Sequence, residues 1–172
     1  MTTSGDHVRP SRRRRIRWHV AVLGAATLAF PAIGRAVLIP NHAMGDVRLG
    51  WSEQRVVREL GDPVTRLVVS DETGETRRLG YRGLTVLLHD GEVALISTSV
   101  SRRANRTRTG VGVGTSERRL RARLWAVACS GSAGGRRCTV GTLRPGRSNT
   151  VFVMRRGRVT RISVGNVLWA RV

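Results

Sequence analysis

The feature that most constrains the fold of this chain is an internal repeat, because the chain aligns with itself in two places. Residues 47–60 align with residues 111–124 without gaps, and six of these fourteen positions are identical. Further along, residues 88–97 align with residues 154–163 and share a Gly, a Val, an Ile and a Ser. Self-similarity at a fixed spacing is typical of a duplicated structural unit. The sequence therefore predicts repeat one at 46–100 and repeat two at 111–165.

Each repeat begins with the signal of a helix N-terminus. Ser52 and Ser116 are each followed by a glutamate. A serine caps the free backbone N–H groups of the first turn, and an acid in that turn favours the positive end of the helix dipole. Apolar residues spaced four apart follow, which places them on one face of a short helix. Gly61-Asp62-Pro63 predicts the end of the first helix, since glycine permits a left-handed cap and proline cannot continue the helix.

Four strand-like runs, rich in Val, Leu and Thr, follow each helix. They lie at 64–70, 77–81, 84–89 and 93–99 in repeat one, and at 125–129, 138–143, 150–155 and 158–164 in repeat two. Asp90-Gly91 and Arg156-Gly157 predict tight two-residue turns. A unit of about 55 residues is marginal alone, because it buries only about 60% of its unfolded surface. We therefore expect an α+β fold: two tandem helix-plus-antiparallel-β-meander repeats that form a sheet covered on one face by short helices.

A positive block precedes an apolar stretch near the N-terminus. Arg12–Arg15 and Arg17 come before the apolar run 19–33, which is the order of a secretory signal. The run is shorter than the roughly 20 residues that span a bilayer as a helix. Residues 1–36 are therefore expected to be a signal peptide or an uncleaved N-terminal anchor, and the protein to be secreted or extracytoplasmic. The remaining expected segments are a linker at 37–45, an Arg-rich linker at 101–110 and a C-terminal tail at 166–172.

The chain has two cysteines, Cys129 and Cys138, on either side of a turn rich in Ser and Gly. An even number of cysteines in an exported chain favours a disulfide. Strands that lead into and out of the turn bring the sulfurs within bonding distance if the two positions pair across the hairpin. We expect this disulfide, with two unpaired structural thiols as the alternative.

The charge of the chain is strongly positive. It has 31 basic residues, all arginine, against 11 acidic residues, for a net charge of +20. Arginines that could follow phosphates make nucleic-acid binding the alternative function. Export argues against that alternative, and a basic surface facing anionic envelope polymers or lipid headgroups explains the same charge. The arginines of the linker that are candidates for such contacts are Arg102, Arg103, Arg106 and Arg108.

The stretch from Gly50-Trp51-Ser52 to Leu60-Gly61-Asp62-Pro63 is similar to the opening signature of the small outer-membrane-assembly lipoproteins of the SmpA/OmlA family. Tandem copies of such a unit resemble the β-lactamase inhibitory protein architecture. The resemblance implies an exported, non-catalytic module that binds another protein. The second copy departs from the signature at Thr115 and at Trp125-Ala126, and the lipoprotein cysteine is absent. No inhibitor contact residue carries over to this chain.

Strict alternation makes both faces of the sheet apolar. In repeat two it places Phe152, Met154 and Arg161 on one face, with the composition of a protein-binding surface. The β-branched set on the other face is then the better core, and the alternative is that both faces are core. Trp169, in the C-terminal tail, is expected to be an exposed contact. Trp51, Tyr81 and Trp125 are expected in the core. For Trp51, directly before an N-cap, the alternative is the outer half of a hydrophobic staple.

The sequence offers little for catalysis. No Ser-His-Asp order, pair of carboxylates, zinc-ligand spacing or phosphate-binding loop stands out, and His89 beside Asp90 is expected to be a solvated polar turn residue. We therefore expect no catalytic residue, metal or cofactor. The expected function is that of an exported, non-enzymatic envelope or extracellular protein that binds another protein or an anionic surface through its sheet face. The membrane itself is expected to contact only the N-terminal segment.

Overall fold

The computed structural model describes residues 1–2, 37–71, 74–132, 135–142 and 144–166. The leader and Trp169 lie outside the described residues, so the expectations about them stay predictions. No helix among the described residues is long and apolar enough to cross a membrane.

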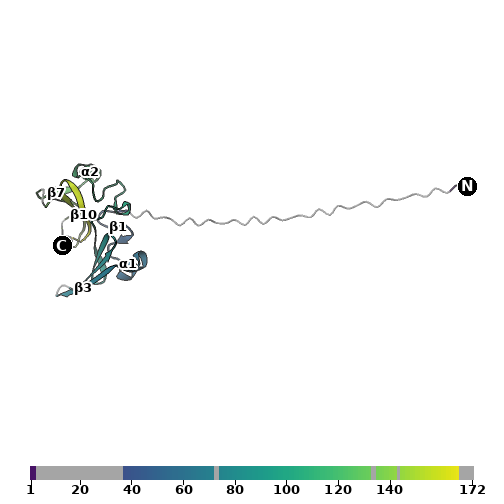
Figure 1. Cartoon of the computed structure of the whole chain (residues 1–172), viewed down its shortest axis with the longest axis horizontal. Coiled ribbons are helices and arrows are strands. Elements are labelled where there is room, and N and C mark those ends of the chain that lie inside the picture. The colour runs from purple at the N-terminus through teal and green to yellow at the C-terminus, as the bar shows by residue number, and fades with distance from the viewer. Residues whose placement is uncertain (3–36, 72–73, 133–134, 143, 167–172) are drawn as a thin grey trace. The chain divides into compact units, whose positions relative to one another are not determined.

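The described residues form mostly antiparallel sheet with two α-helices (Figure 1). Eight strands make one sheet in the order β3-β4-β5-β6-β10-β9-β8-β7, and β1 and β2 form a separate hairpin. The elements are β1 (Ala43–Met44), β2 (Val47–Arg48), α1 (Glu53–Leu60), β3 (Thr65–Asp71), β4 (Gly74–Tyr81), β5 (Leu84–His89), β6 (Glu92–Thr98), the 3₁₀ helix η1 (Arg103–Asn105), α2 (Glu117–Arg123), β7 (Ala128–Ser130), β8 (Arg137–Val140), β9 (Ser148–Arg155) and β10 (Arg158–Asn166).

Both helices begin where the Ser-Glu pairs predict. The Ser52 hydroxyl accepts a hydrogen bond from the Arg55 backbone N–H, and Ser116 does the same for Arg119, each at 3.4 Å. Gly61 ends α1 with φ of 78°, a conformation that favours glycine. The helix starts and the first helix end are therefore confirmed.

The two-residue turns are also confirmed. Asp90 and Gly91 have φ of 48° and 82°, and Arg156 and Gly157 have 49° and 71°. Positive φ at both central residues is the geometry of the turns that match the twist of a β-hairpin. Strand positions agree with the sequence to within three residues. The largest differences are the start of β4 at Gly74 rather than 77, the start of β7 at Ala128 rather than 125, and the end of β8 at Val140 rather than 143.

A β-bulge interrupts both of these hairpins. In the first, Leu88 is opposite Val93 but Leu87 is opposite Leu95, so Ala94 has no cross-strand partner. In the second, the register shifts between Val159 and Arg161. A bulge adds one residue to one strand, so the residues that follow it change faces relative to strict alternation.

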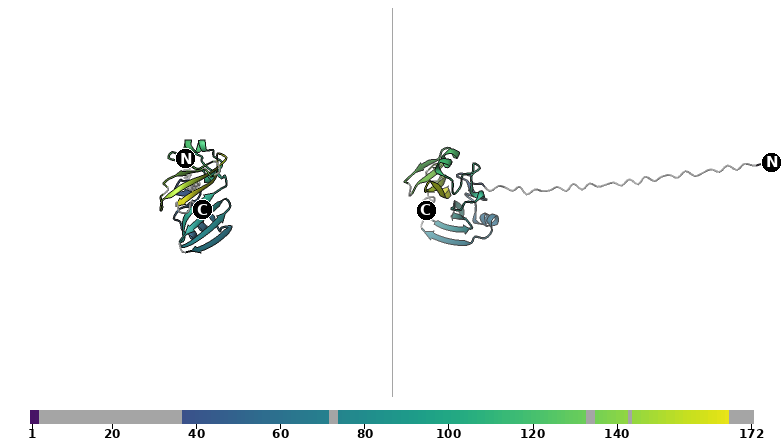
Figure 2. Two further views of the ribbon diagram at one scale, coloured as in Figure 1. Left: turned by 90° about the vertical axis from the view of Figure 1, so that its left-hand side faces the viewer. Right: turned by 45° about the horizontal axis from the view of Figure 1, so that its top comes forward.

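One face of the sheet carries the core. Val56 of α1 and Leu120 of α2 belong to a single buried cluster with side chains from six of the strands of the sheet, and Met44 and Val47 of the β1–β2 hairpin join it. In Figure 1, α1 and β1 lie to the right of the strands of the first half, and the left panel of Figure 2 looks onto the sheet from the other side. The strand side chains of the cluster are Leu79, Val86, Leu88, Val93, Ile96, Cys138, Phe152, Met154, Val159, Ile162 and Val164.

Both segments interpreted as linkers contribute to the folded structure. Leu38 is fully buried, and its backbone N–H donates to the Arg106 carbonyl oxygen at 2.9 Å. Asn105 is buried and its side-chain amide donates to the Thr98 hydroxyl at 3.2 Å. These contacts tie residues before the first helix to the connection between the two halves.

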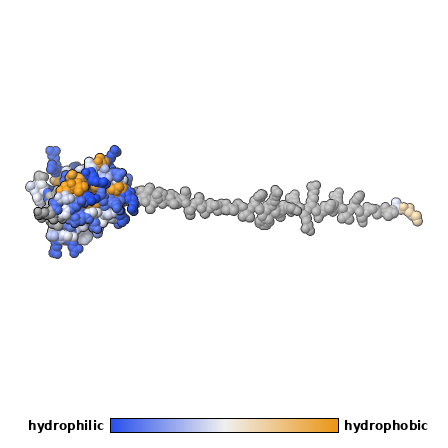
Figure 3. Space-filling model, turned by 90° about the horizontal axis from the view of Figure 1, so that it is seen from below, coloured by the Kyte–Doolittle hydropathy of each residue, from blue (hydrophilic) through white to orange (hydrophobic). Residues whose placement is uncertain are grey.

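The face of the molecule seen in Figure 3 is mainly polar and carries apolar patches, drawn in orange. Four of the exposed large apolar side chains are nearly consecutive, in and just before β3: Val64, Leu67, Val68 and Val69. All seven residues of β3 are exposed.

Candidate binding face

The face of the sheet opposite the core cluster, which we call the second face, carries arginines above aliphatic and hydroxyl side chains. Arg78 of β4 pairs with Leu87 of β5, which pairs with Leu95 of β6. Paired residues of antiparallel strands lie on the same face, so these three side chains form one row across the first half of the sheet.

A matching row crosses the other half. Arg137 of β8 pairs with Val153 of β9, and Val153 pairs with Arg161 of β10. Neighbouring strands lie about 4.8 Å apart, so Arg137 and Arg161 stand roughly 10 Å apart with an aliphatic side chain between them. Between the two rows, Ser97 of β6 lies opposite Ser163 of β10.

Two hollows lie over these rows. One, of about 580 Å³, includes Arg78, Leu87 and Leu95 in its lining, and the other, of about 460 Å³, includes Arg137 and Val153. Both are lined by Ser99, Arg161 and Ser163. No Asp or Glu of the described residues lines either hollow. The two hollows therefore share a basic lining with a partly apolar floor, while Glu92, opposite His89, lies toward the end of the same face.

Two of the residues predicted for the binding face lie in the core instead. Phe152 and Met154 are 0% and 1% exposed and belong to the buried cluster, so their assignment to an exposed face is wrong. Arg161 is exposed on the second face. The physical reason that Arg161 and Phe152 lie on different faces is the bulge before Arg161. Because of the bulge, Ile162 instead of Arg161 lies on the face of Phe152, and Arg161 lies on the face of Val153.

The linker arginines do not act as one group. Arg102, Arg103 and Arg108 are exposed, whereas Arg106 is partly buried. The guanidinium of Arg106 donates to the carbonyl oxygens of Gly110 and Val113, at 3.0 and 3.3 Å. Arg106 therefore holds the chain that leads into α2, and it is not presented to a partner.

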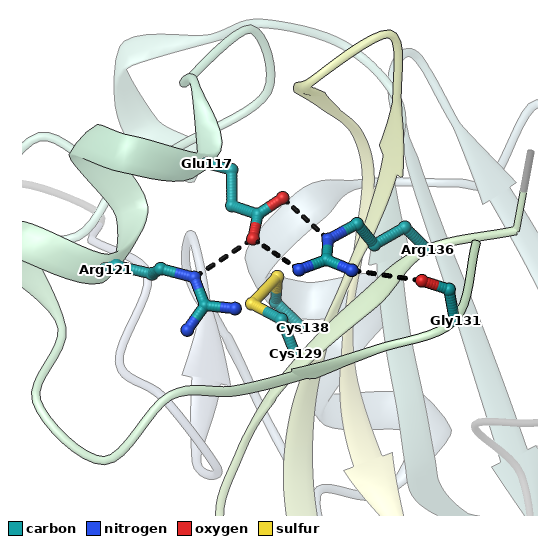
Figure 4. Close-up of a disulfide and its surroundings, with 6 residues drawn as sticks. All are labelled: Glu117, Arg121, Cys129, Gly131, Arg136 and Cys138. Atoms are coloured by element: carbon teal, nitrogen blue, oxygen red, sulfur yellow. Dashed lines mark hydrogen bonds and ion pairs between the residues drawn. A yellow bond between two sulfur atoms is a disulfide. The ribbon is translucent and has the colours of Figure 1, made fainter. Parts of the chain in front are cut away.

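The disulfide between Cys129 and Cys138 is present, as predicted, and the two cysteines are directly opposite each other on β7 and β8. Beside it, Glu117 of α2 accepts hydrogen bonds from the guanidinium of Arg136 at 2.7 and 2.8 Å and from Arg121 at 3.0 Å (Figure 4). The hydrogen bonds from Arg136 and then Arg121 lower the pKa of Glu117 to about 2. This ion-pair cluster was not predicted from the sequence, because Arg136 is one of many arginines and only the packing of α2 against the hairpin brings it to Glu117.

Glu117 and the two sulfurs also lie close enough together to be considered as metal ligands. The sulfurs are bonded to each other, and thiolate is the form of cysteine that binds metal. Glu117 is already engaged by two guanidinium groups. We therefore interpret these three residues as a disulfide beside an ion pair and propose no metal site at them.

The first helix has a corresponding glutamate. Glu53 accepts from Arg77 of β4 at 2.8 Å and pairs with Arg66 of β3 at 3.1 Å. The hydrogen bond to Glu75, followed by that to Glu53, raises the pKa of Arg77. The first-turn glutamate thus links α1 to the outer strands β3 and β4, and it links α2 to the connection between β7 and β8.

The aromatic residues divide into two groups. Trp51 and Tyr81 pack against the core cluster while partly exposed, and the Arg55 guanidinium lies 4.2 Å from the centre of the Trp51 ring. Trp125 is 91% exposed, so its assignment to the core is wrong. Trp125 directly follows the C-cap of α2, Leu124, and precedes Ala126, which has φ of 59°. His89 is partly buried, and its Nε2 lies 3.5 Å from an Asp90 carboxylate oxygen.

Comparisons with known proteins give fold similarities of low identity. The sequence matches no family model and no curated protein. Among solved structures, the chain is similar to an extracellular protein containing a SCP domain from Bacillus anthracis, with 4% identity and a TM-score of 0.47, covering 91% of this chain and 50% of that one. This chain thus spans about half the length of that protein.

Two further solved structures are similar over 67% of this chain, each at 12% identity. One is a DUF4309 family protein from Bacillus subtilis, with a TM-score of 0.41 and 78% of that chain covered. The other is a proposed beta-lactamase inhibitor protein from Streptococcus mutans, with a TM-score of 0.30 and 83% of that chain covered. Similarity at this level does not establish a shared family or function.

Proposed function

We propose that this chain is an exported, non-enzymatic protein that binds an acidic protein partner through the second face of its sheet. The observation that carries the proposal is the set of three arginines, Arg78, Arg137 and Arg161, in two rows with aliphatic side chains, with no carboxylate among the described residues that line the hollows. Arginine is enriched at protein interfaces, where it combines charge with a large apolar stem.

The proposal includes a duplicated architecture. The Gly50 N–H donates to the Val93 carbonyl oxygen at 2.9 Å, and the Gly114 N–H donates to the Val159 carbonyl oxygen at 2.8 Å. These are equivalent positions of the two aligned segments. The matching caps, turns and bulges described above support the same interpretation: each half is one helix followed by a four-stranded meander.

A duplication of this kind gives the sheet an approximate two-fold axis at its centre. Ser97 lies opposite Ser163, and on either side of this pair Ile96 faces Val164 and Thr98 faces Ile162. The same axis relates Arg78 to Arg137, since each lies on the third strand from the junction. The row of Arg78, Leu87 and Leu95 and the row of Arg137, Val153 and Arg161 are then copies of one motif. Arg161 stands at the position that corresponds to Leu95, so the second row has one more charge.

The composition of the described part of the second face favours a protein partner over a nucleic-acid partner. Proteins that bind single strands stack bases on aromatic side chains in a basic groove. Of the residues that line the two hollows, Tyr81 is the one aromatic side chain among the described residues, and it also packs against the core cluster. Arginines spaced over aliphatic side chains suit carboxylates on a folded surface instead.

Variants of equal charge test this proposal. Arg137→Gln with Arg161→Gln removes two charges from the second face, and Arg118→Gln with Arg119→Gln removes two exposed charges from α2. Poly-glutamate serves as the acidic polypeptide and duplex DNA as the comparison ligand, both titrated at physiological ionic strength. We expect the first variant to lose about tenfold in affinity for poly-glutamate, or about 1.4 kcal/mol, and the α2 variant to lose less than about twofold.

Two results contradict the proposal. Equal losses in both variants would mean that poly-glutamate responds to net charge alone. Tighter binding of duplex DNA than of poly-glutamate, with a steep decrease as salt rises, would favour the nucleic-acid alternative.

A further inference from the structure

The two edges of the eight-stranded sheet differ in length. At one edge, β7 has three residues and is bonded to β8 by the disulfide. At the other edge, β3 has seven residues, all exposed, and its one strand partner among the described residues is β4. Natural edge strands are usually short, charged or covered, because their free N–H and C=O groups can pair with another chain.

The side chains of β3 make this edge still more open to pairing. Leu67, Val68 and Val69 are 56%, 48% and 51% exposed. Successive residues point to opposite faces, so Val68 lies on the core side and its two neighbours lie on the second face. Both sides of the edge are thus apolar at the middle of the strand.

We propose that β3 pairs antiparallel with β3 of a second copy of this chain, which joins the two sheets across a two-fold axis at Val68. In a symmetric antiparallel pair that continues the sheet, paired residues share a face and the axis passes through one residue. Val68 is the middle residue of Thr65–Asp71, so this register is the one that pairs all seven residues. Val68 faces Val68 of the second copy, Leu67 faces Val69, Arg66 faces Ser70 and Thr65 faces Asp71.

The charge of the strand favours a second copy despite the net charge of +20. β3 carries one arginine and one aspartate, and Arg66 is already paired with Glu53 at 3.1 Å. The contact itself is therefore close to neutral. Closure also favours a copy, since pairing removes the long edge from both chains and leaves only the three-residue β7 strands at the ends of the joined sheet.

A single introduced thiol tests the register. The chain has two cysteines and both are in the disulfide, so an added cysteine is the one available thiol. Directly paired residues have Cα atoms about 4.5–5.5 Å apart, within the range of a disulfide. Val68→Cys should therefore form a covalent dimer of the full chain under mild oxidation. Ser70→Cys is the matched control, because the two copies of residue 70 lie about 13 Å apart along the strands.

Sedimentation of the protein as recovered from expressing cells tests the dimer itself. We expect the wild type to sediment as a dimer, and Val68→Lys to shift it to monomer by placing two charges at the axis. Trp125→Ala, which removes an exposed apolar side chain elsewhere, should leave the dimer intact. A monomeric wild type, equal cross-linking of Val68→Cys and Ser70→Cys, or no cross-linking of either would overturn the proposal.

Discussion

At the scale of single residues, Glu117 links α2 to the β7–β8 hairpin through its ion pairs with Arg136 and Arg121. Its pKa of about 2 lies below the value of about 4.3 for a free glutamate. A carboxyl group with a lowered pKa stabilises the fold fully above its unfolded pKa, and this contribution is lost as the pH falls through its folded pKa.

We therefore predict that stability falls between about pH 4 and pH 2 and that Glu117→Gln makes this fall shallower. Acid titration of the free energy of unfolding, followed by circular dichroism, measures the effect. Because the side chains are partly exposed, the change at neutral pH should be modest. Glu59→Gln removes an exposed carboxylate from α1 and controls for the loss of one negative charge. An identical acid profile for wild type and Glu117→Gln would show that the ion pair does not stabilise the fold.

Phe152 gives a second test at this scale. Its side chain is fully buried, so Phe152→Ala should lower the free energy of unfolding by about 3–5 kcal/mol. Trp125→Ala removes a side chain that is 91% exposed and should change stability by less than about 0.5 kcal/mol. Denaturant titration compares the two. A near-neutral Phe152→Ala would contradict the placement of Phe152 in the core.

Local signals in the sequence predicted much of the structure at this scale. The caps at Ser52 and Ser116 and the turn at Asp90-Gly91 follow from the preferences of the residues themselves. The bulge before Arg161 did not follow, because Thr160 and its neighbours are compatible with a regular strand. Because the extra residue of this bulge was not recognised, the sequence-based prediction placed Arg161 on the same face as Phe152.

At the scale of elements, the disulfide joins the two strands of the short β7–β8 hairpin. β7 has three residues, and the cysteines enclose a loop with a sequence separation of nine. Closing a loop of this length lowers the entropy of the unfolded chain, which raises the free energy of the unfolded state by about 2–3 kcal/mol at room temperature.

Reduction should therefore lower the free energy of unfolding by about 2–3 kcal/mol. Denaturant titration with and without dithiothreitol measures the difference. The double variant Cys129→Ala with Cys138→Ala should be insensitive to the reductant. If the wild type unfolds at the same denaturant concentration in both conditions, the disulfide does not stabilise the fold.

Strand positions were predictable at this scale, but the order of strands was not. Alternating apolar residues and turn signals locate each strand locally. The pairing of β6 with β10 joins residues 95–98 to residues 162–165. The sequence of either strand alone does not identify the strand with which it pairs. Because the strand order was not predictable, the sequence also did not identify β3 as an edge strand.

At the scale of the whole molecule, the charge of +20 should affect the two proposed contacts in opposite directions. Salt screens the attraction between the second face and an acidic partner, so poly-glutamate binding should weaken as salt rises. Salt also screens the repulsion between two basic chains, so the β3 dimer should strengthen. Titrating sodium chloride in the binding and sedimentation experiments measures both trends, and a change of the same sign in both would contradict this assignment of contacts.

The most direct test of the account is the intact mass of the protein recovered from its own cell fraction, before and after reduction and thiol labelling. We predict an extracytoplasmic chain that lacks two hydrogens until it is reduced, beginning near Val37 if the leader is cleaved, or of full length in the membrane if the leader is an anchor. A full-length soluble chain with both thiols free would contradict export and would make nucleic-acid binding the leading function.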